Sequence, residues 1–191
     1  MGYRRGFKAE ANWYARELRR ELHLEPHEPL CQWQLAEHLG YKIAKLSSYL
    51  DLQPDATSYL MSEIGQKEFS AVTIFNNSYY LIIHNDAHHI RRQSANIAHE
   101  LAHGILMHDP APLTQANGAR SFNKEQEDEA NWLGPALLIS EEAAILIARR
   151  DMPVELTCNE YRVSQDLLQL RLQVTGALIR AARRRRMLTS V

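Results

Sequence analysis

Hydrophobic positions along the chain follow two different spacings. Near the N-terminus, apolar side chains recur every three or four residues between charged ones, and this pattern predicts an amphipathic helix over residues 8–22. Further along, short apolar runs rich in β-branched and aromatic residues predict strands. The remaining elements that we predict are a short helix over 30–38 that ends at Gly40, strands over 41–46, 59–64, 71–75 and 79–85, a loop over 47–57, helices over 90–108, 125–138 and 141–149, and several short helices after Pro153.

The order of these elements indicates the fold class. The turn Asn76-Asn77-Ser78 is typical of a hairpin between the last two strands, and Ser140 is a typical N-cap for the helix that follows it. A helix, a small sheet and then helices fit an α+β fold better than alternating βαβ units. We therefore expect a small antiparallel or mixed sheet packed on helices, with a domain over 1–150 and a helical C-terminal subdomain over 151–191.

The predicted helix over 90–108 contains His99-Glu100-Leu101-Ala102-His103, an HExxH motif. Histidines four residues apart lie on one face of a helix, with about 6 Å between their β-carbons. That spacing allows both imidazoles to bind one Zn²⁺ at about 2.0–2.1 Å each. Glu100 can then accept a proton from the attacking water, so the motif predicts a metal, a nucleophile and a catalytic base.

A catalytic zinc site usually has three protein ligands and a water, so a third ligand is expected outside the motif. Asp109 has the six-residue spacing that one class of such enzymes uses, but the glycine here, Gly104, comes too early for the turn. His108 lies about 140° around the helix from His103. An exposed or capping residue at the helix end is the simpler interpretation of His108.

An acidic cluster at the start of the helix over 125–138 is the better source of the third ligand. Glu127 lies about 60° from the apolar position Ala130, whereas Glu129 lies about 100° and Glu125 about 140° away. Glu127 is therefore best placed to reach a half-buried metal. Asn131 follows one turn later, where it could orient a ligand histidine. The simpler alternative is a solvated acidic first turn, stabilised by the helix dipole.

Composition and charge set bounds on the function. The 191 residues, 45% hydrophobic and 24% charged, fit one domain with a small appendage. The net charge of −1 argues neither for nor against nucleic acid, and Cys31 and Cys158 are not in a metal-ligand spacing. Neither a signal-peptide h-region nor an apolar run of about 18 residues is present. We therefore expect a cytoplasmic protein without a membrane partner.

Several stretches of the chain combine in a way that resembles one known family. They are residues 96–103 with His108 close behind, residues 127–133, the lead-in over 8–24 and 29–40, and the tail segments 161–164 and 171–176. In these the chain is similar to the ImmA/IrrE family of zinc-dependent metallopeptidases, over most of residues 8–180. Pro135 departs from the family pattern, and it removes one backbone hydrogen bond from its helix.

The resemblance implies the site and the substrate class. His99, His103 and Glu127 would be the zinc ligands and Glu100 the catalytic base. Family members typically cleave helix-turn-helix repressors or antitoxins, which induces the genes that those proteins silence. The resemblance therefore implies Zn²⁺ as cofactor and a repressor of this kind as partner. A His-His-Glu ligand set also accepts Mn²⁺ or Fe²⁺.

The C-terminal part suggests a second kind of partner. Ser164 is a typical N-cap, and a short helix, a turn and a second helix around it would form a helix-turn-helix-like unit. Arg180 and Arg183–Arg186 then form a basic end that could contact DNA phosphates. The simpler interpretation is a small helical subdomain packed on the catalytic helices, with a solvated tail.

Three functional hypotheses follow. The first is a zinc endopeptidase in which the strand Tyr79–Asn85 binds an extended substrate by main-chain pairing. His84, Tyr79 and Tyr80 could assist the transition state, although core or surface roles suit each of them. The second hypothesis is a DNA-binding regulator with a structural zinc site. The third is a protein that sequesters a repressor without cutting it, and the intact Glu100 argues against this because a scaffold needs no base.

Overall fold

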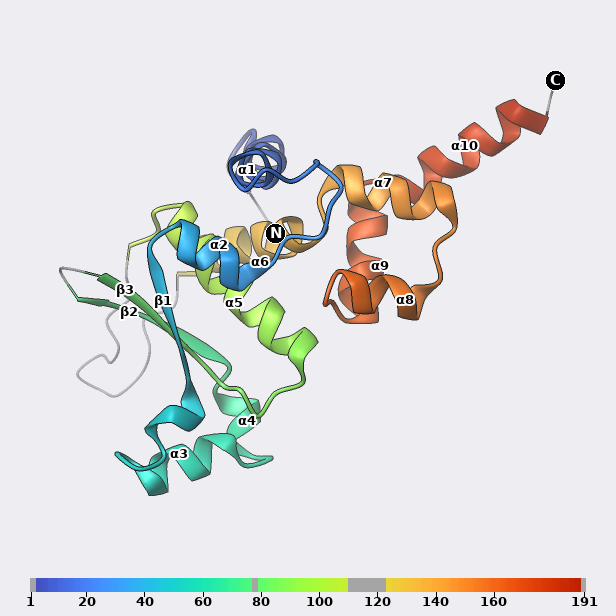
Figure 1. Ribbon diagram of the computed structural model, residues 1–191. Coiled ribbons are helices and arrows are strands. Elements are labelled where there is room, and N and C mark those ends of the chain that lie inside the picture. Colours follow the sequence, from blue (N-terminus) through green and yellow to red (C-terminus); the bar gives the residue numbers. More distant parts are fainter. Residues whose placement is uncertain (1–2, 77–78, 110–122, 190–191) are drawn as a thin grey trace.

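The computed structural model describes residues 3–76, 79–109 and 123–189, and these contain a three-stranded mixed sheet (Figure 1). The strands are β1 (Tyr41–Lys45), β2 (Ala71–Asn76) and β3 (Tyr79–His84), in the order β1-β3-β2. β3 pairs in parallel with β1 and antiparallel with β2, so it is the central strand. The antiparallel pair confirms the predicted hairpin, whose turn residues 77–78 lie outside the described residues.

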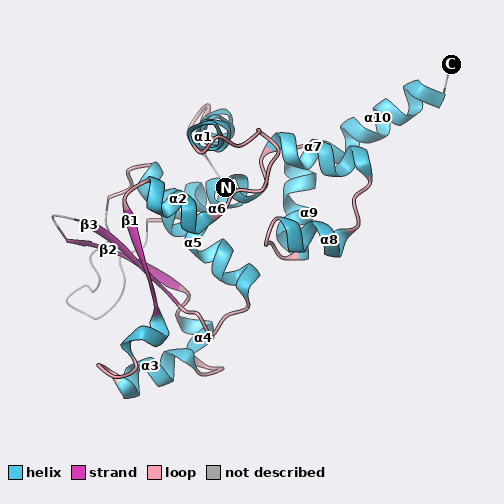
Figure 2. Cartoon of the chain, in the orientation of Figure 1, coloured by secondary structure: helices cyan, strands magenta, loops and turns pink. Residues whose placement is uncertain are grey.

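Helices form the rest of the structure, and Figure 2 shows the strands gathered at one side of them. The α+β fold class is therefore confirmed. The helices are α1 (Phe7–Glu21), α2 (Gln32–His38), a 3₁₀ helix (Leu46–Tyr49), α3 (Pro54–Met61), α4 (Gly65–Glu68), α5 (Ile90–Ile105), α6 (Lys124–Leu138), α7 (Glu141–Arg150), α8 (Val154–Glu160), α9 (Gln165–Val174) and α10 (Ala177–Thr189). Ser140 and Ser164 cap α7 and α9 through their hydroxyls, as predicted.

The predicted strand over 59–64 is wrong, because these residues lie in α3 and the turn after it. The helix begins inside the segment that we expected to be a loop. Pro54 occupies the first turn, where its missing N–H is not needed, and Asp55 is favourably placed beside the helix N-terminus. These start signals outweigh the β-propensity of the short apolar run that follows them.

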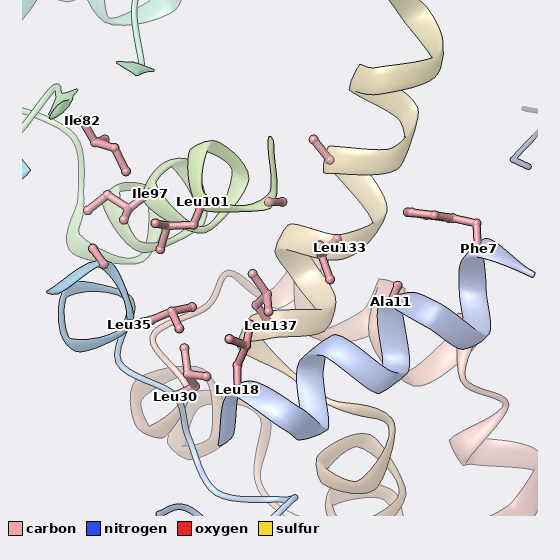
Figure 3. Close-up of a cluster of buried hydrophobic side chains, with 13 residues drawn as sticks. Phe7, Ala11, Leu18, Leu30, Leu35, Ile82, Ile97, Leu101, Leu133 and Leu137 are labelled. Carbon is pink, nitrogen blue, oxygen red and sulfur yellow. The ribbon is translucent and has the colours of Figure 1, made fainter. Parts of the chain in front are cut away.

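The larger hydrophobic core lies between α1, α2, α5, α6 and the sheet (Figure 3). Leu101, in the middle of the HExxH motif, is fully buried in it together with Leu133 of α6. Because Leu101 faces the core, the two histidines on either side of it in the sequence face away from it. α5 and α6 approach closely at Gly134, where an added β-carbon would lie 3.3 Å from the backbone of His99.

A second core cluster joins α7 to the C-terminal helices. It contains Ile139, Ala144, Ile147 and Leu168, and Ala98 of α5 also contributes to it. The cluster thus draws residues from both sides of position 150. The division into 1–150 and 151–191 stays a prediction.

Two buried arginines hold the end of α6, which continues through Pro135 to Leu138. Arg19 donates to the carbonyl of Leu137 at 2.9 Å, and Arg171 donates to the carbonyl of Ile139 at 2.8 Å. The last carbonyls of a helix lack partners within the helix, so these bonds satisfy acceptors that would otherwise be buried alone.

In the described part of the chain, no single helix is both long and apolar enough to cross a membrane. By length and composition only, the pair α6 and α7, bent by 52°, passes the same test. The cytoplasmic location stays a prediction.

Candidate metal centre

The imidazoles of His99 and His103 meet the carboxylate of Glu127 in the space between α5 and α6. The Nε2 atoms of the two histidines are 3.1 Å apart. Glu127 Oε2 lies 3.4 Å from His99 Nε2, and Glu127 Oε1 lies 3.5 Å from His103 Nε2. The three side chains are 24–31% exposed, so each donor is half-buried and still accessible.

This triangle of donor atoms fits a tetrahedral metal ion. A tetrahedral ion with bonds of about 2.0–2.1 Å places its ligand atoms about 3.3–3.4 Å apart. The two histidine nitrogens are 3.1 Å apart, and each lies 3.4 or 3.5 Å from one of the two oxygens of Glu127, so these distances are close to that value. Two nitrogens and one carboxylate oxygen are also ligands that Zn²⁺ accepts. The residues therefore suit a metal with three protein ligands and a fourth position open.

The charge state of His103 also suits metal binding. Burial, together with the nearby His99 and His108, lowers the pKa of His103 to about 4. Neutral imidazole, with a lone pair on one ring nitrogen, is the form that binds a metal. His103 therefore offers a lone pair at neutral pH.

Glu100 is held by a residue that the sequence analysis did not select. The hydroxyl of Thr73, on the edge strand β2, donates to Glu100 Oε2 at 2.6 Å. This bond ties the carboxylate of the HExxH motif to the sheet. The only sequence signal for Thr73 was its place in a predicted strand, which does not indicate which helix the strand faces.

An aromatic row crosses all three strands beside this site. Tyr80 stacks on Tyr41 with ring centroids 4.8 Å apart and on Phe75 at 4.7 Å. Phe75 lies two residues from Thr73 on β2, so both side chains lie on the sheet face that meets α5. Burial raises the pKa of Tyr41, and the charge of Glu100 adds to the shift, which places Tyr41 near the candidate base. A β-carbon on Gly104 would overlap the Tyr41 hydroxyl.

The strand Tyr79–Asn85 cannot bind a substrate as an added strand, because β3 is paired on both sides. The edges available among the described strands are β1 and β2. His84 is also no transition-state helper, since its side chain is 1% exposed and lies against Trp33. Tyr80 belongs to the aromatic row, and Tyr79 is exposed beside Lys42.

The structure places the remaining candidates differently from our expectation. Asn131 is exposed, and within the described residues no side chain hydrogen-bonds to it. The place beside His103 is taken by His108, whose Nδ1 lies 2.9 Å from His103 Nδ1. His108 is therefore not an exposed residue at the helix end. Asp109 is exposed and outside the donor triangle.

Among its acidic neighbours in the described part of the chain, Glu127 alone reaches His99 and His103, while Glu129 turns to His108. Glu125 is exposed at the start of α6. The helical-wheel argument thus selected the side chain that the structure brings to the donor triangle. The role of that triangle in binding a metal stays a prediction.

Comparison with known proteins adds one finding. A family model for peptidase family M78, described as the IrrE N-terminal-like domain, matches residues 33–173. The matched range includes the donor triangle, Glu100, Thr73 and His108, and it begins after α1. No curated protein and no solved structure gives a significant match.

Proposed function

The chain belongs to the peptidase family of the IrrE N-terminal-like domain, and from that premise we propose that it is a metal-dependent endopeptidase. The observation that carries the proposal is the half-buried triangle of His99, His103 and Glu127 donors. Glu100, in the same motif, supplies a base beside the triangle. We propose Zn²⁺ as the ion, because two imidazoles and one carboxylate are a usual catalytic zinc set.

Each polar residue of the site has a task in peptide hydrolysis. A bound zinc ion would supply a Lewis acid that polarises the scissile carbonyl and lowers the pKa of water. Glu100 accepts a proton from the attacking water and delivers it to the leaving amine. Thr73 donates to Oε2 of Glu100, so the other oxygen, Oε1, would be the one that accepts the proton.

The substrate binds in this account along the edge strand β2. An extended peptide can pair through main-chain hydrogen bonds with this edge, which no other described strand covers, and the peptide then runs past Glu100 because Thr73 lies on the same strand. Phe75, at 47% exposure, and the aromatic row beside it offer apolar contact for a substrate side chain. Main-chain pairing suits any sequence, so specificity depends on such side-chain contacts.

The variant Glu100→Gln tests the mechanism. It keeps the size of the side chain and the Thr73 contact but removes the base. We expect cleavage to fall by at least about a hundredfold, since general bases contribute about 10²–10⁴. Metal content, measured by mass spectrometry, should stay at the wild-type level. A fully active Glu100→Gln protein would rule out this mechanism.

We propose a helix-turn-helix repressor or antitoxin as the substrate class, on the resemblance described above. The test is incubation of the metal-loaded protein with purified repressors of this class, beginning with one encoded next to this chain. The expected result is a discrete cleavage, seen by intact mass, that the Glu100→Gln protein does not produce. Equal fragments with both proteins would mean that another protease makes the cut.

A second candidate function, contact with nucleic acid, is supported by a groove between α7 and α10. Its lining consists of Leu146, Arg149, Arg150, Ala181, Arg184 and Arg185. Four arginines from two helices thus line one groove, and one of them, Arg185, donates to the carbonyl of Ala148 at 3.1 Å and lies 3.9 Å from Asp151. Arginines gathered at one surface suit the phosphates of a nucleic-acid backbone.

The arginine groove is tested by a gel-shift titration at several salt concentrations. Replacement of Arg150 and Arg184 by alanine should weaken DNA binding and reduce its salt dependence. Equal DNA affinity and equal salt dependence for the wild type and the double variant would rule out a nucleic-acid site in this groove.

A further inference from the structure

A chain of polar side chains begins at His103 and leads away from the metal centre. His103 Nδ1 lies 2.9 Å from His108 Nδ1, and His108 Nε2 lies 3.1 Å from Glu129 Oε2. The other oxygen of Glu129 accepts from Arg4 Nε at 2.9 Å. We call His108, Glu129 and Arg4 the outer chain. It connects one predicted metal ligand to the N-terminal segment.

The first two members of the outer chain are protected from water. The side chains of His108 and Glu129 are 7% and 14% exposed. The turn after α5 brings His108 back to the motif: Met107 adopts a left-handed conformation with φ 52°, and the N–H of His108 donates to the carbonyl of His103 at 3.0 Å. Hydrogen bonds in such a site compete little with solvent, so they can fix the orientation of a ring.

The outer chain also fixes which nitrogen of each ring carries hydrogen. A carboxylate only accepts, so His108 Nε2, which faces Glu129, is a donor, and in the neutral imidazole His108 Nδ1 then keeps its lone pair. His103 Nδ1, which faces that lone pair, is then the donor. The lone pair of His103 is left on Nε2, the atom that faces His99 and Glu127.

We propose that His108 and Glu129 are positioning residues that hold His103 in the tautomer and orientation needed to bind the metal. The inference rests on the metal site of the proposed function. Ligand histidines generally donate their second N–H to a fixed acceptor, and loss of that acceptor commonly weakens metal affinity by about 10–100-fold. Within the described residues, no side chain offers the Nδ1 of His99 a comparable partner. The two ligands are therefore supported unequally.

Arg4 extends this support to a segment that precedes the family match. Its guanidinium bonds both Glu129 and Glu10 of α1, the latter at 2.7 Å. Arg4 is 52% exposed, and exposed ion pairs contribute little on their own. We therefore expect the order of importance to be His108, then Glu129, then Arg4.

The test is the zinc affinity of purified full-length variants, measured by competition with a chromophoric chelator. His108→Leu removes the acceptor and should weaken zinc binding by about 10–100-fold. His108→Asn offers a carbonyl oxygen near the position of Nδ1 and should recover part of that loss. Glu129→Gln should show a smaller loss, because a neutral amide still accepts from His108 but more weakly.

Asp128→Asn is the matched control for Glu129→Gln. It removes the same charge from the neighbouring position, where Asp128 pairs only with Lys124 at 2.7 Å among the described residues. Its zinc affinity should equal that of the wild type. The visible spectrum of the Co²⁺-loaded proteins adds a second readout, since an altered ligand orientation changes the absorption bands while a change in stability alone does not.

The outcomes separate this inference from the proposed function. Equal zinc affinities for wild type, His108→Leu and Glu129→Gln would overturn the positioning role and leave the metal site intact. An equal loss in Asp128→Asn and Glu129→Gln would also overturn it, because net charge would then explain both. A wild-type protein that binds no zinc would overturn the inference and the proposed function together. If the His108→Leu apoprotein unfolds at a lower temperature than the wild-type apoprotein, the zinc affinities of His108→Asn and Glu129→Gln decide whether the positioning role holds.

Discussion

The two ends of α6 both gather charged side chains, but they do so with opposite chemistry. At the N-terminal end, Glu127 turns to the imidazoles of α5. At the C-terminal end, the guanidinium groups of Arg19 and Arg171 donate to the last carbonyls of the helix. Both arrangements follow the helix dipole, with acidic groups at the start and cations at the end.

The difference shows which charged cluster can hold an ion. A guanidinium group has donors and no lone pair, so the C-terminal end is closed once its carbonyls are satisfied. Burial lowers the pKa of Arg19 and of Arg171 to about 10, which leaves both charged at neutral pH. At the N-terminal end, lone pairs of three half-buried side chains converge. One end therefore fixes α6 in place, and the other has the converging lone pairs that the proposed metal requires.

The largest effect on stability is expected at the closed end. Arg19→Leu removes the donor from the buried carbonyl of Leu137 and from the partly buried carbonyl of Glu28. Each unsatisfied group costs about 1–3 kcal/mol, so the free energy of unfolding should fall by roughly 3 kcal/mol, as measured by urea titration. Arg20→Leu is the control, because Arg20 is exposed and pairs with Glu17. An equal, small effect of both variants would mean that the buried bonds do not secure α6.

A substitution in the middle of α6 should have a smaller effect on stability and should also weaken binding at the proposed metal site. In Gly134→Ala, the new methyl group lies 3.3 Å from the backbone of His99, so α6 must move away from α5. Overpacking of this kind costs about 1–3 kcal/mol, against a gain of about 1 kcal/mol in helix propensity. We expect a net loss of stability and weaker zinc binding. A more stable protein with unchanged zinc affinity would show that the contact between α5 and α6 accommodates a methyl group.

At the open end, Thr73 tests whether the base is positioned from the sheet. Thr73→Val keeps the shape and removes the hydroxyl that donates to Glu100. The loss of one hydrogen bond to a charged group, about 1.5 kcal/mol, should lower kcat/KM about tenfold, while metal content stays constant. Thr73→Ser should retain most of the activity. Full activity of Thr73→Val would remove Thr73 from the mechanism.

The smallest effect is the pH dependence of apoprotein stability. Burial lowers the pKa of His84 and of His88 below the usual value, which is about 6.5 in an unfolded chain. Below that pH the unfolded state binds more protons than the folded state, so stability is present above pH 6.5 and falls in acid. His84→Leu should flatten this slope in thermal melts from pH 5 to 8. An unchanged slope would mean that His84 does not contribute.

Local patterns predicted most helices and part of the site. The three- and four-residue spacing located α1 and α5–α7 within a few residues, and the angle around α6 selected Glu127 from its acidic neighbours. These predictions depend on contacts along one helix or between two adjacent helices. They fail where a start signal such as Pro54 overrides the apolar pattern, as in α3.

The rest of the site depends on contacts between distant segments. Thr73 reaches Glu100 only because β2 pairs beside β3, and the central place of β3 cannot be read from its residues. From the sequence we expected the regular helix to continue to His108, which would turn this side chain away from His103. Instead, Met107 adopts a left-handed conformation after α5, and the chain turns so that His108 contacts His103. A turn of this kind leaves no clear periodic signal.

The central claim is that the open end of α6 holds a metal with His99 and His103. The most direct measurement is metal content, by mass spectrometry, of protein purified without a metal-affinity tag. We predict about one zinc per chain in the wild type and in Glu125→Ala, and a loss of that zinc in His103→Ala and Glu127→Ala. A wild-type protein without metal, or a Glu127→Ala protein that retains it, would contradict the account.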